Sequence, residues 1–339
     1  MLYRALTREQ SMKRFNVYVT RMISQETIDD LRQFHDVEVN PHDRALTRDE
    51  LLKAVQGRDA VITLLTDTID GEVLDAAGPQ CKIFANYAVG FNNFDLQAAT
   101  QRGMIMTNTP GVLDDATATH AWALLLATAR RISESERFVR ADKWQGWAPM
   151  AFIGQDVDNK TLGVAGMGRI GSKFPRKAAA FDMKVIYTDA QRNPEIERQV
   201  GATFVDKETL LRESDYLSLH LPLLPETQHY IGAAELAKMK RTAILINAAR
   251  GPLVDEKALV AALRDQVIWG AGLDVFEREP ELEPGLSSLD NVLVVPHIAS
   301  ATIETRLAMG KIATENVISV LKGEKPQTCI NPEVLRSAE

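Results

Sequence analysis

From residue 16 onward, short apolar runs alternate with segments of helical periodicity, and this alternation restricts the fold more than any other feature. The first runs are NVYVT, VEVN and AVITLL, separated by SQETIDDLRQF and TRDELLKAV. Parallel strands joined by crossover helices give this pattern. Ser24 and Thr47 stand where helix N-caps are expected, with acidic residues in the turn that follows. The pattern predicts an α/β fold built on parallel sheets.

A long helical segment divides the alternation into two series. Residues 114–142 contain no glycine or proline and are apolar in their first half, which predicts one continuous helix between two domains. A second strand series then runs from TLGVAGM to VLVV. The final helical segment, residues 301–323, has no strand of its own in that series, so we expect it to return to the first domain. The predicted domains are 1–111 with 304–339, and an inserted Rossmann-like domain over 112–303.

Composition excludes several classes of function. The net charge of −7 and the lack of a basic arm argue against nucleic acid or membrane surfaces as partners. Cys81 and Cys329 fall outside CxxC spacing, so we expect neither a disulfide framework nor a metal site. No apolar run approaches the 18 or so residues of a membrane span. We expect a cytoplasmic protein with small-molecule partners, and interpret residues 1–11 as an extension, with Met12 an alternative start.

A glycine-rich loop follows the first strand of the second series. In GVAGMGRIG, Gly166, Gly168 and Gly171 have the spacing that a dinucleotide-binding loop requires. One glycine allows the tight turn, one lets the backbone approach a pyrophosphate, and one allows close helix packing, with the phosphates held at a helix N-terminus. Pro175 falls within the first turns of the expected helix and is predicted to kink it.

The next strand, KVIYT, ends in Asp189, about 20 residues beyond the first glycine. A carboxylate at this position accepts hydrogen bonds from a ribose 2′-hydroxyl and repels a 2′-phosphate. The sequence therefore favours NAD over NADP. Arg192 leaves the alternative open, because an arginine beside the ribose is able to serve a phosphate.

Ionisable residues end three further strands. Arg250 follows AILINAA, Glu279 comes soon after the strand ending in LDV, and His297 follows VLVV, which we interpret as a strand buried on both faces. Ligands of open parallel sheets bind at the carboxyl ends of strands. Reduction of a 2-oxo acid needs a cation for the carboxylate and a proton donor near neutral pH, which arginine and a glutamate-paired histidine supply. Asp274 is a candidate acceptor for the nicotinamide amide.

With these motifs the chain resembles the D-isomer-specific 2-hydroxyacid dehydrogenases, most closely the glyoxylate/hydroxypyruvate reductase branch. The resemblance covers residues 14–331 and rests on motifs in a fixed order: NYAVGFNNFDLQAATQRG, TNTPGVLDDATATHAWALLLATARR, GVAGMGRIG, LHLPLLPETQHYIG, NAARGPLVDEKALVAAL, GAGLDVFEREP and VVPHIASAT. It implies two Rossmann-like or flavodoxin-like parallel-sheet domains, NADH as cofactor, a small 2-oxo acid substrate and a homodimer formed through the long helix and its flanks.

The resemblance also implies site residues. The catalytic positions fall on Arg250, Glu279 and His297. The expected cofactor contacts are Gly166, Met167, Gly168, Arg169, Ile170, Gly171, Asp189, Ala248, Ala249, Arg250 and Asp274. Substrate contacts are expected from Leu65, Val89, Gly90, Arg250, His297 and Trp147, with Trp144 as the alternative to Trp147; the tryptophan would come from a neighbouring subunit.

Two departures and two alternatives accompany this resemblance. Ala299 stands where the family more often has glycine, and Asn92 where aspartate is frequent, so the preferred substrate is left open. Another dehydrogenase of the family, acting on D-lactate or D-3-phosphoglycerate, is one alternative. An NAD-sensing corepressor, a binding protein that keeps a similar trio, is the alternative from a different class.

Overall fold

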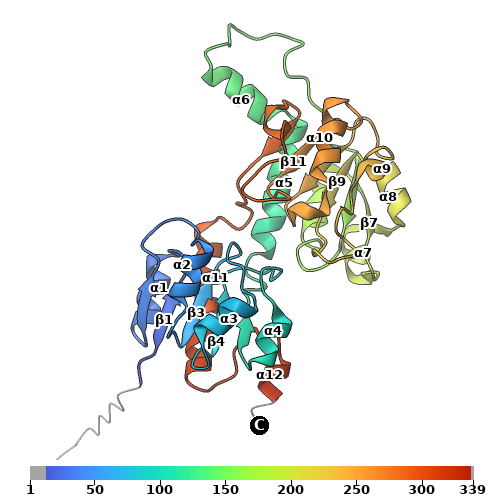
Figure 1. The fold of residues 1–339 in the computed structure, drawn as a ribbon. Helices are drawn as coiled ribbons and strands as arrows, with labels where there is room; N and C mark the ends of the chain where they lie inside the picture. The colour runs from blue at the N-terminus through green and yellow to red at the C-terminus, as the bar shows by residue number, and fades with distance from the viewer. Residues whose placement is uncertain (1–12, 337–339) are drawn as a thin grey trace, which may run out of the picture. The chain divides into compact units, whose positions relative to one another are not determined.

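The computed structural model describes residues 13–336 and divides the chain into two compact units (Figure 1). One unit contains the described residues up to Val112 and those from Thr302 onward, and the other spans Leu113–Ala301. The boundaries predicted after residues 111 and 303 lie close to these. The interpretation of residues 1–11 and of Met12 falls outside the described residues.

The first unit is a five-stranded parallel sheet with the strand order β2-β1-β3-β4-β5. Its strands are β1 (Asn16–Val19), β2 (Asp36–Val39), β3 (Ala60–Thr63), β4 (Ile83–Asn86) and β5 (Ile105–Thr107). Its helices are α1 (Gln25–Arg32), α2 (Arg48–Ala54), α3 (Gly71–Ala77), α4 (Leu96–Gln101), α11 (Ile303–Leu321) and α12 (Glu333–Arg336). α11 packs against α1, β3 and β4.

Both predicted N-caps of this unit are confirmed. The Ser24 hydroxyl accepts the Thr27 N–H at 3.2 Å. The Thr47 hydroxyl accepts the Glu50 N–H, and the Glu50 carboxylate accepts the Thr47 N–H in return at 2.8 Å, which completes a capping box. These caps fix where α1 and α2 begin.

The second unit is a seven-stranded parallel sheet with the strand order β12-β11-β10-β9-β6-β7-β8. Its strands are β6 (Thr161–Ala165), β7 (Lys184–Thr188), β8 (Thr203–Phe204), β9 (Tyr216–Leu219), β10 (Ile244–Asn247), β11 (Gly270–Leu273) and β12 (Val292–Val294). Its α-helices are α5 (Asp114–Ala129), α6 (Ile132–Arg140), α7 (Pro194–Val200), α8 (Lys207–Glu213), α9 (Ala233–Leu236) and α10 (Glu256–Arg264). Three 3₁₀ helices complete it: η1 (Phe174–Phe181), η2 (Gly251–Leu253) and η3 (Leu286–Ser288).

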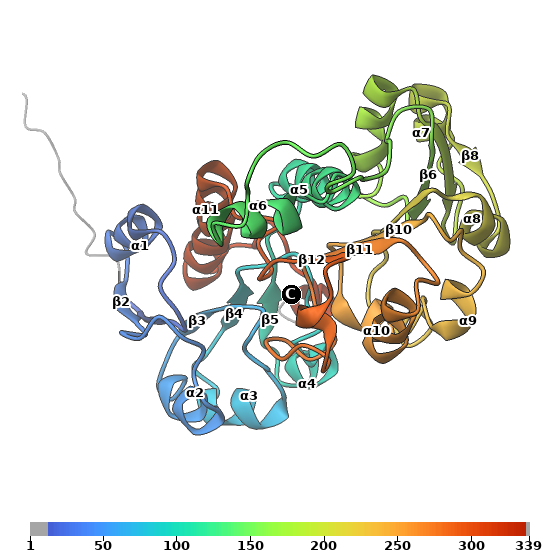
Figure 2. The same ribbon diagram turned by 90° about the horizontal axis from the view of Figure 1, so that it is seen from above.

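Both faces of this sheet are covered. Figure 2 shows α5 on one face of β10–β12 and α10 on the other. Along β10, Ile244 and Ile246 join the core beneath α5, whereas Leu245 joins the core beneath α10. Because successive strand residues face opposite sides, a strand in this position is apolar throughout, and its polar residues gather at the ends.

The prediction of one continuous helix over residues 114–142 is wrong. α5 ends at Ala129, and α6 begins at Ile132 after Arg131, which adopts a left-handed conformation with φ of 51°. The Ala129 carbonyl accepts the Gln155 N–H at 2.8 Å, so it is not used to continue the helix. Gly154 allows this approach, since a Cβ there would lie 2.2 Å from the Ala129 oxygen. The break therefore depends on a segment distant in sequence.

Within residues 13–336, no helix is both long and apolar enough to cross a bilayer. In the same range, no group of three or more His, Cys, Asp or Glu side chains is arranged to hold a metal ion.

Candidate active site

A histidine–glutamate pair lies beyond the carboxyl ends of β11 and β12. His297 Nδ1 is 2.9 Å from Glu279 Oε2. A carboxylate only accepts hydrogen bonds, so the hydrogen belongs to Nδ1 and leaves Nε2 to exchange a proton. Glu279 Oε1 accepts the Phe276 N–H at 3.0 Å, which orients the carboxylate. The structure thus brings together two of the three residues predicted to carry the chemistry.

The strand that leads to His297 differs from its prediction. β12 is an edge strand, and of its residues Val292 is buried whereas Leu293 and Val294 are only half-buried. The expected burial on both faces is therefore wrong, because an apolar run cannot by itself indicate whether a strand is central or at an edge.

Asp274, at the end of β11, holds the backbone around His297. Its carbonyl accepts the His297 N–H at 2.9 Å, and its carboxylate oxygens accept the N–H groups of Ile298 and Ala299 at 2.7 and 2.9 Å. The Asp274 side chain is fully buried. His297 has a φ of 51°, a conformation that non-glycine residues rarely adopt. These three bonds stabilise it, and Ala299 takes part through its backbone N–H, which does not depend on its side chain.

Arg250 follows β10 and is placed by Asn247, the last residue of that strand. The Asn247 amide donates to the Arg250 carbonyl at 2.9 Å, and its oxygen accepts the Ala249 N–H at 3.1 Å. Arg250 Nη1 donates to the Ala249 carbonyl at 2.7 Å. Burial lowers the pKa of Arg250, an effect that the nearby charge of Glu279 opposes. Since an arginine remains protonated in proteins, the site keeps a partly desolvated cation suited to an anionic ligand.

Gly251 brings the Arg250 segment against the segment that carries Glu279. A Cβ at Gly251 would lie 1.8 Å from the carbonyl oxygen of Phe276. Only a residue without a side chain fits this contact. The two segments are thereby held at a fixed separation, although Glu279 comes 29 residues after Arg250 in the sequence.

A buried glutamate fixes the Glu279 segment from the other side. Glu256, at the start of α10, accepts the N–H groups of Glu277 and Glu283 at 2.5 and 3.2 Å. Its burial raises its pKa. The sequence analysis missed Glu256 and Asn247. The sequence contains a signal for Asn247, since it is a polar residue at the end of an apolar strand. It contains none for Glu256, because an acidic residue in the first turn of a helix is common.

The glycine loop has the geometry that its spacing indicates. Gly166 has a φ of 92°, and a Cβ there would lie 2.8 Å from the His220 carbonyl. A Cβ at Gly171 would lie 2.0 Å from the Gly166 oxygen. A Cβ at Gly168, by contrast, would meet no atom within 4 Å. Gly166 and Gly171 thus serve the turn and the packing, and Gly168 leaves open the space that a pyrophosphate requires, so the loop fits a dinucleotide.

The element after this loop is not the expected α-helix. A turn follows, and then η1, a 3₁₀ helix with Pro175 in its first turn. Proline has no N–H to donate and clashes inside an α-helix, but its fixed φ suits a helix start. Pro175 therefore begins a new helix instead of kinking a continuous one.

Asp189 lies against the glycine loop. Its Oδ2 accepts the Met167 N–H at 2.5 Å, and its Oδ1 accepts the Ala190 N–H at 2.6 Å. A carboxylate has about four lone-pair sites, so both oxygens keep capacity for ribose hydroxyls. Within this unit the loop and the carboxylate predicted to bind the cofactor are adjacent.

Other histidines of this unit have different surroundings. His220 is half-buried, desolvation lowers its pKa to about 3, and its Nε2 lies 2.9 Å from the Ser218 hydroxyl oxygen. A group that stays neutral at working pH is a poor proton donor. His229 forms a second pair with a carboxylate, Nε2 lying 2.7 Å from Glu277 Oε1. Glu277 also accepts the Glu256 N–H, so this pair belongs to the scaffold beneath Glu279.

The predicted substrate contacts of the first unit lie at one edge of its sheet. Leu65 follows β3, and Val89 and Gly90 follow its neighbour β4. Within residues 13–336, neither Val89 nor Gly90 has a protein acceptor for its N–H. Two asparagines that the sequence analysis missed fix this segment: the Asn86 amide donates to the Gly90 carbonyl at 2.9 Å, and Asn108 donates to Val89 at 2.8 Å.

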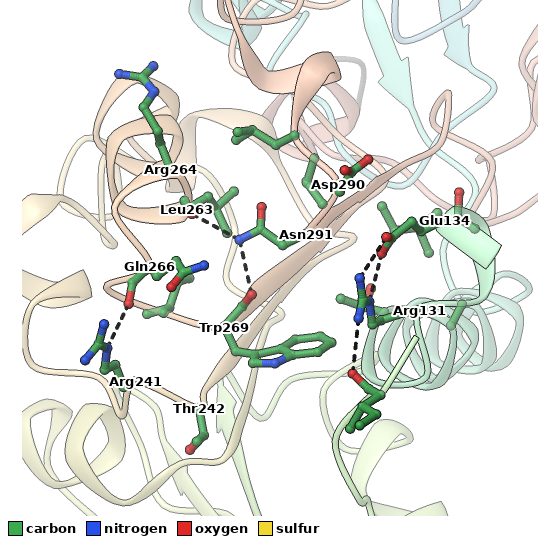
Figure 3. Close-up of a pocket in the computed structure, with 18 residues that line it drawn as sticks. Arg131, Glu134, Arg241, Thr242, Leu263, Arg264, Gln266, Trp269, Asp290 and Asn291 are labelled. Carbon is green, nitrogen blue, oxygen red and sulfur yellow. Dashed lines mark hydrogen bonds and ion pairs between the residues drawn. The ribbon is translucent and has the colours of Figure 1, made fainter. Parts of the chain in front are cut away.

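The second unit contains a cavity of about 630 Å³ (Figure 3). It lies at the end of the seven-stranded sheet opposite to Arg250, Glu279 and His297. Among the residues that line it, Arg241 precedes β10, Trp269 precedes β11 and Asn291 precedes β12. The cavity therefore lies at the amino ends of these strands. Ligands of parallel sheets bind at the carboxyl ends. The cavity is therefore separate from Arg250, Glu279 and His297.

Comparison with known proteins identifies the family of this chain. Residues 122–299 match the family model of the D-isomer specific 2-hydroxyacid dehydrogenase NAD binding domain. A glyoxylate reductase of Thermococcus litoralis is 48% identical and covers 95% of this chain and 98% of its own length. The crystal structure of the TT0316 protein from Thermus thermophilus is 43% identical, with a TM-score of 0.86 over 93% of this chain and 99% of that one.

An NADPH-dependent glyoxylate/hydroxypyruvate reductase from Sinorhizobium meliloti, solved with NADP and malonate, is 29% identical, with a TM-score of 0.82 over 95% of this chain and 98% of its own. These likenesses extend over both units and over nearly the full length of each relative. The chain belongs to the D-isomer-specific 2-hydroxyacid dehydrogenases.

Proposed function

We propose that this protein reduces glyoxylate to glycolate and hydroxypyruvate to D-glycerate, with NADH as the reductant. The observation that carries the proposal is the His297–Glu279 pair at the sheet edge where Arg250 also emerges. The glyoxylate reductase of Thermococcus litoralis supports glyoxylate as a substrate. The reaction consumes one NADH and one proton for each 2-oxo acid reduced.

Each residue of the trio has a chemical role in this proposal. Bound NADH supplies the hydride that adds to C2 of the 2-oxo acid. His297 donates the proton to the carbonyl oxygen through Nε2, while Glu279 stabilises the charged ring and holds its orientation. Arg250 binds the substrate carboxylate and polarises the carbonyl with its planar fork of donors.

Two backbone N–H groups of the first unit are part of the proposal. The N–H groups of Val89 and Gly90 are proposed to receive the substrate carboxylate, with Leu65 beside it. The orientation of these N–H groups is maintained by Asn86 and Asn108, which bond the carbonyls of the same two residues. Backbone donors of this kind need no reorganisation when an anion arrives.

For the cofactor, the proposed contacts are the glycine loop, Asp189, the Ala248–Arg250 segment and Asp274. Asp189 lies against Met167 with lone pairs left for a ribose, and its charge opposes a 2′-phosphate. Both Asp274 oxygens already accept backbone N–H groups, so an amide of the nicotinamide would share them.

Initial rates with four 2-oxo acids test the proposal: glyoxylate, hydroxypyruvate, pyruvate and 3-phosphohydroxypyruvate, each with NADH and with NADPH. We expect kcat/KM to be highest for glyoxylate and hydroxypyruvate and higher with NADH than with NADPH. Equal or better rates with NADPH would contradict the cofactor assignment. Preference for pyruvate or the phosphorylated acid would contradict the substrate assignment, since those acids suit the D-lactate and D-3-phosphoglycerate enzymes.

We also propose that the protein is a homodimer in which Trp147, or else Trp144, reaches the partner's substrate site. Large exposed apolar side chains gather on α6 and the segment after it, and Trp147 is 85% exposed. Several large exposed apolar side chains in one segment favour a role in a protein interface. The exposed side chains of this stretch are Ile132, Val139, Trp144, Trp147, Met150 and Ile153.

Charging one face of α6 tests the dimer. Ile132 and Val139 lie two helical turns apart on the same face, and both are about half exposed. We expect the variant carrying Ile132→Glu and Val139→Glu to run as a monomer in light scattering, because the interface would have to bury two charges. Met22→Glu, at an equally exposed apolar residue of the first unit, serves as the control. A monomeric wild-type protein would contradict the proposal.

A further inference from the structure

The loop after β7 is fastened to the middle of the glycine loop at two points. The Met167 N–H donates to Asp189 Oδ2 at 2.5 Å, and the Met167 carbonyl accepts from the Asn193 amide at 3.2 Å. Arg192 stands between these two anchors in sequence. The backbone of Arg192 therefore belongs to the short anchored loop that begins with Asp189, the residue proposed to bind the ribose.

Arg192 is held by an acidic partner on the next helix. Its Nε donates to Glu197 Oε1 at 3.1 Å, and its Nη2 donates to Oε2 at 2.8 Å, a bidentate pair. The guanidinium also lies 5.9 Å from the centre of the Phe204 ring. A planar guanidinium held along one edge by a carboxylate has those donors already engaged.

Glu197 is itself fixed in place. The Tyr187 hydroxyl donates to Glu197 Oε1 at 2.7 Å and accepts the Asn193 N–H at 2.7 Å. The Glu197 side chain is only 18% exposed, whereas that of Arg192 is 63% exposed. Arg192 and Tyr187 lower the pKa of Glu197, so its carboxylate stays ionised. The anionic side of the pair is thus ordered by the sheet, and the cation is the partner that is able to turn toward solvent.

We propose that Glu197 determines cofactor specificity by holding Arg192 away from the 2′-phosphate of NADPH. This inference rests on the proposed function, and it assigns the discrimination against NADPH to two carboxylates. Asp189 repels the phosphate directly, and Glu197 neutralises the cation that would otherwise attract it.

Removing the charge of Glu197 should have a measurable effect on NADPH binding. With Glu197 present, the pair contributes no net charge beside the ribose, and a phosphate must compete with a carboxylate for the same donors. Glu197→Gln keeps the shape and the bonds to neutral partners but leaves Arg192 with an uncompensated charge. In the wild type a phosphate gains Arg192 only by breaking the bidentate ion pair with Glu197, whereas in Glu197→Gln it gains a charge-assisted bond without breaking an ion pair.

Equilibrium binding of NADH and NADPH, followed by nucleotide fluorescence, tests the proposal without any turnover. We expect Glu197→Gln to tighten NADPH binding relative to NADH by roughly five- to tenfold, since the charge involved is partly exposed. Unchanged NADH affinity shows that the site is folded. The matched control is Glu195→Gln, on the same helix, whose carboxylate accepts from the Gln199 amide and which should leave the ratio unchanged.

A double variant tests whether the gain in NADPH affinity depends on Arg192. Adding Arg192→Ala to Glu197→Gln should return the NADPH-to-NADH ratio to about the wild-type value. A wild-type ratio in Glu197→Gln, or a gain that persists in the double variant, would overturn the role of Glu197. If the wild-type protein bound neither nucleotide, the cofactor assignment itself would fail, which is distinguishable from a failure of Glu197 alone.

Discussion

His297→Asn is expected to lower kcat for glyoxylate by about 10³-fold, because general acid catalysis by a positioned side chain contributes roughly 10²–10⁴-fold. Asparagine is the suitable replacement at this position. It tolerates the left-handed conformation that His297 adopts, with a φ of 51°, so the bonds from Asp274 to the following backbone remain possible. NADH affinity, measured by fluorescence, should change little.

The second histidine–glutamate pair provides a matched control for this variant. His229 also has a positive φ, of 50°, and lies 2.7 Å from Glu277. If the chemistry belongs to the pair at the strand ends, His229→Asn should retain most of the turnover. A large loss of kcat in His229→Asn together with a small loss in His297→Asn would assign the proton donor to the other pair and refute the proposal.

Arg250→Ala is expected to reduce kcat/KM for glyoxylate by ~10²–10⁴-fold while leaving NADH binding largely intact. Two charge-assisted hydrogen bonds to the substrate, at about 1.5–3 kcal/mol each, would be lost. Arg250→Lys should recover only part of the loss, since lysine keeps the charge but not the planar fork. Steady-state kinetics and nucleotide fluorescence separate the two effects.

The control for Arg250 lies at the opposite end of the same strand. Arg241 precedes β10 and donates to the Gln266 carbonyl at 3.3 Å. Arg241→Ala removes a cation of the same type from the same strand and should leave kcat/KM near the wild-type value. If Arg250→Ala instead abolished NADH binding with little further effect on the substrate, its role would be with the cofactor.

The sequence predicted the strands and their polar ends because both follow from local patterns. Each apolar run of the second series became a strand, and Arg250, Glu279 and His297 all lie beyond the carboxyl ends of neighbouring strands. Parallel topology brings those ends to one edge without any further information. The glycine spacing was equally informative, since Gly166 and Gly171 each have a steric reason in the folded chain and Gly168 leaves open space beside the loop.

The features that escaped prediction depend on contacts between distant segments. The break after α5 requires Gln155 and Gly154 to approach the Ala129 carbonyl, and residues 130–131 themselves contain no helix breaker. Glu256 acts on the Glu279 segment through backbone N–H groups, which no residue pattern encodes. Asp274 was expected to serve the cofactor, and its bonds to the backbone around His297 emerge only in three dimensions.

The central claim is that this protein transfers a hydride from NADH to C2 of glyoxylate while His297 supplies the proton. Its most direct test uses NADH with deuterium at the transferable position of nicotinamide C4, with the glycolate analysed by mass spectrometry. We expect one deuterium at C2 of glycolate for each NADH oxidised, at a rate about 10³-fold lower in His297→Asn. No NADH oxidation with glyoxylate, or glycolate without deuterium, would contradict the account.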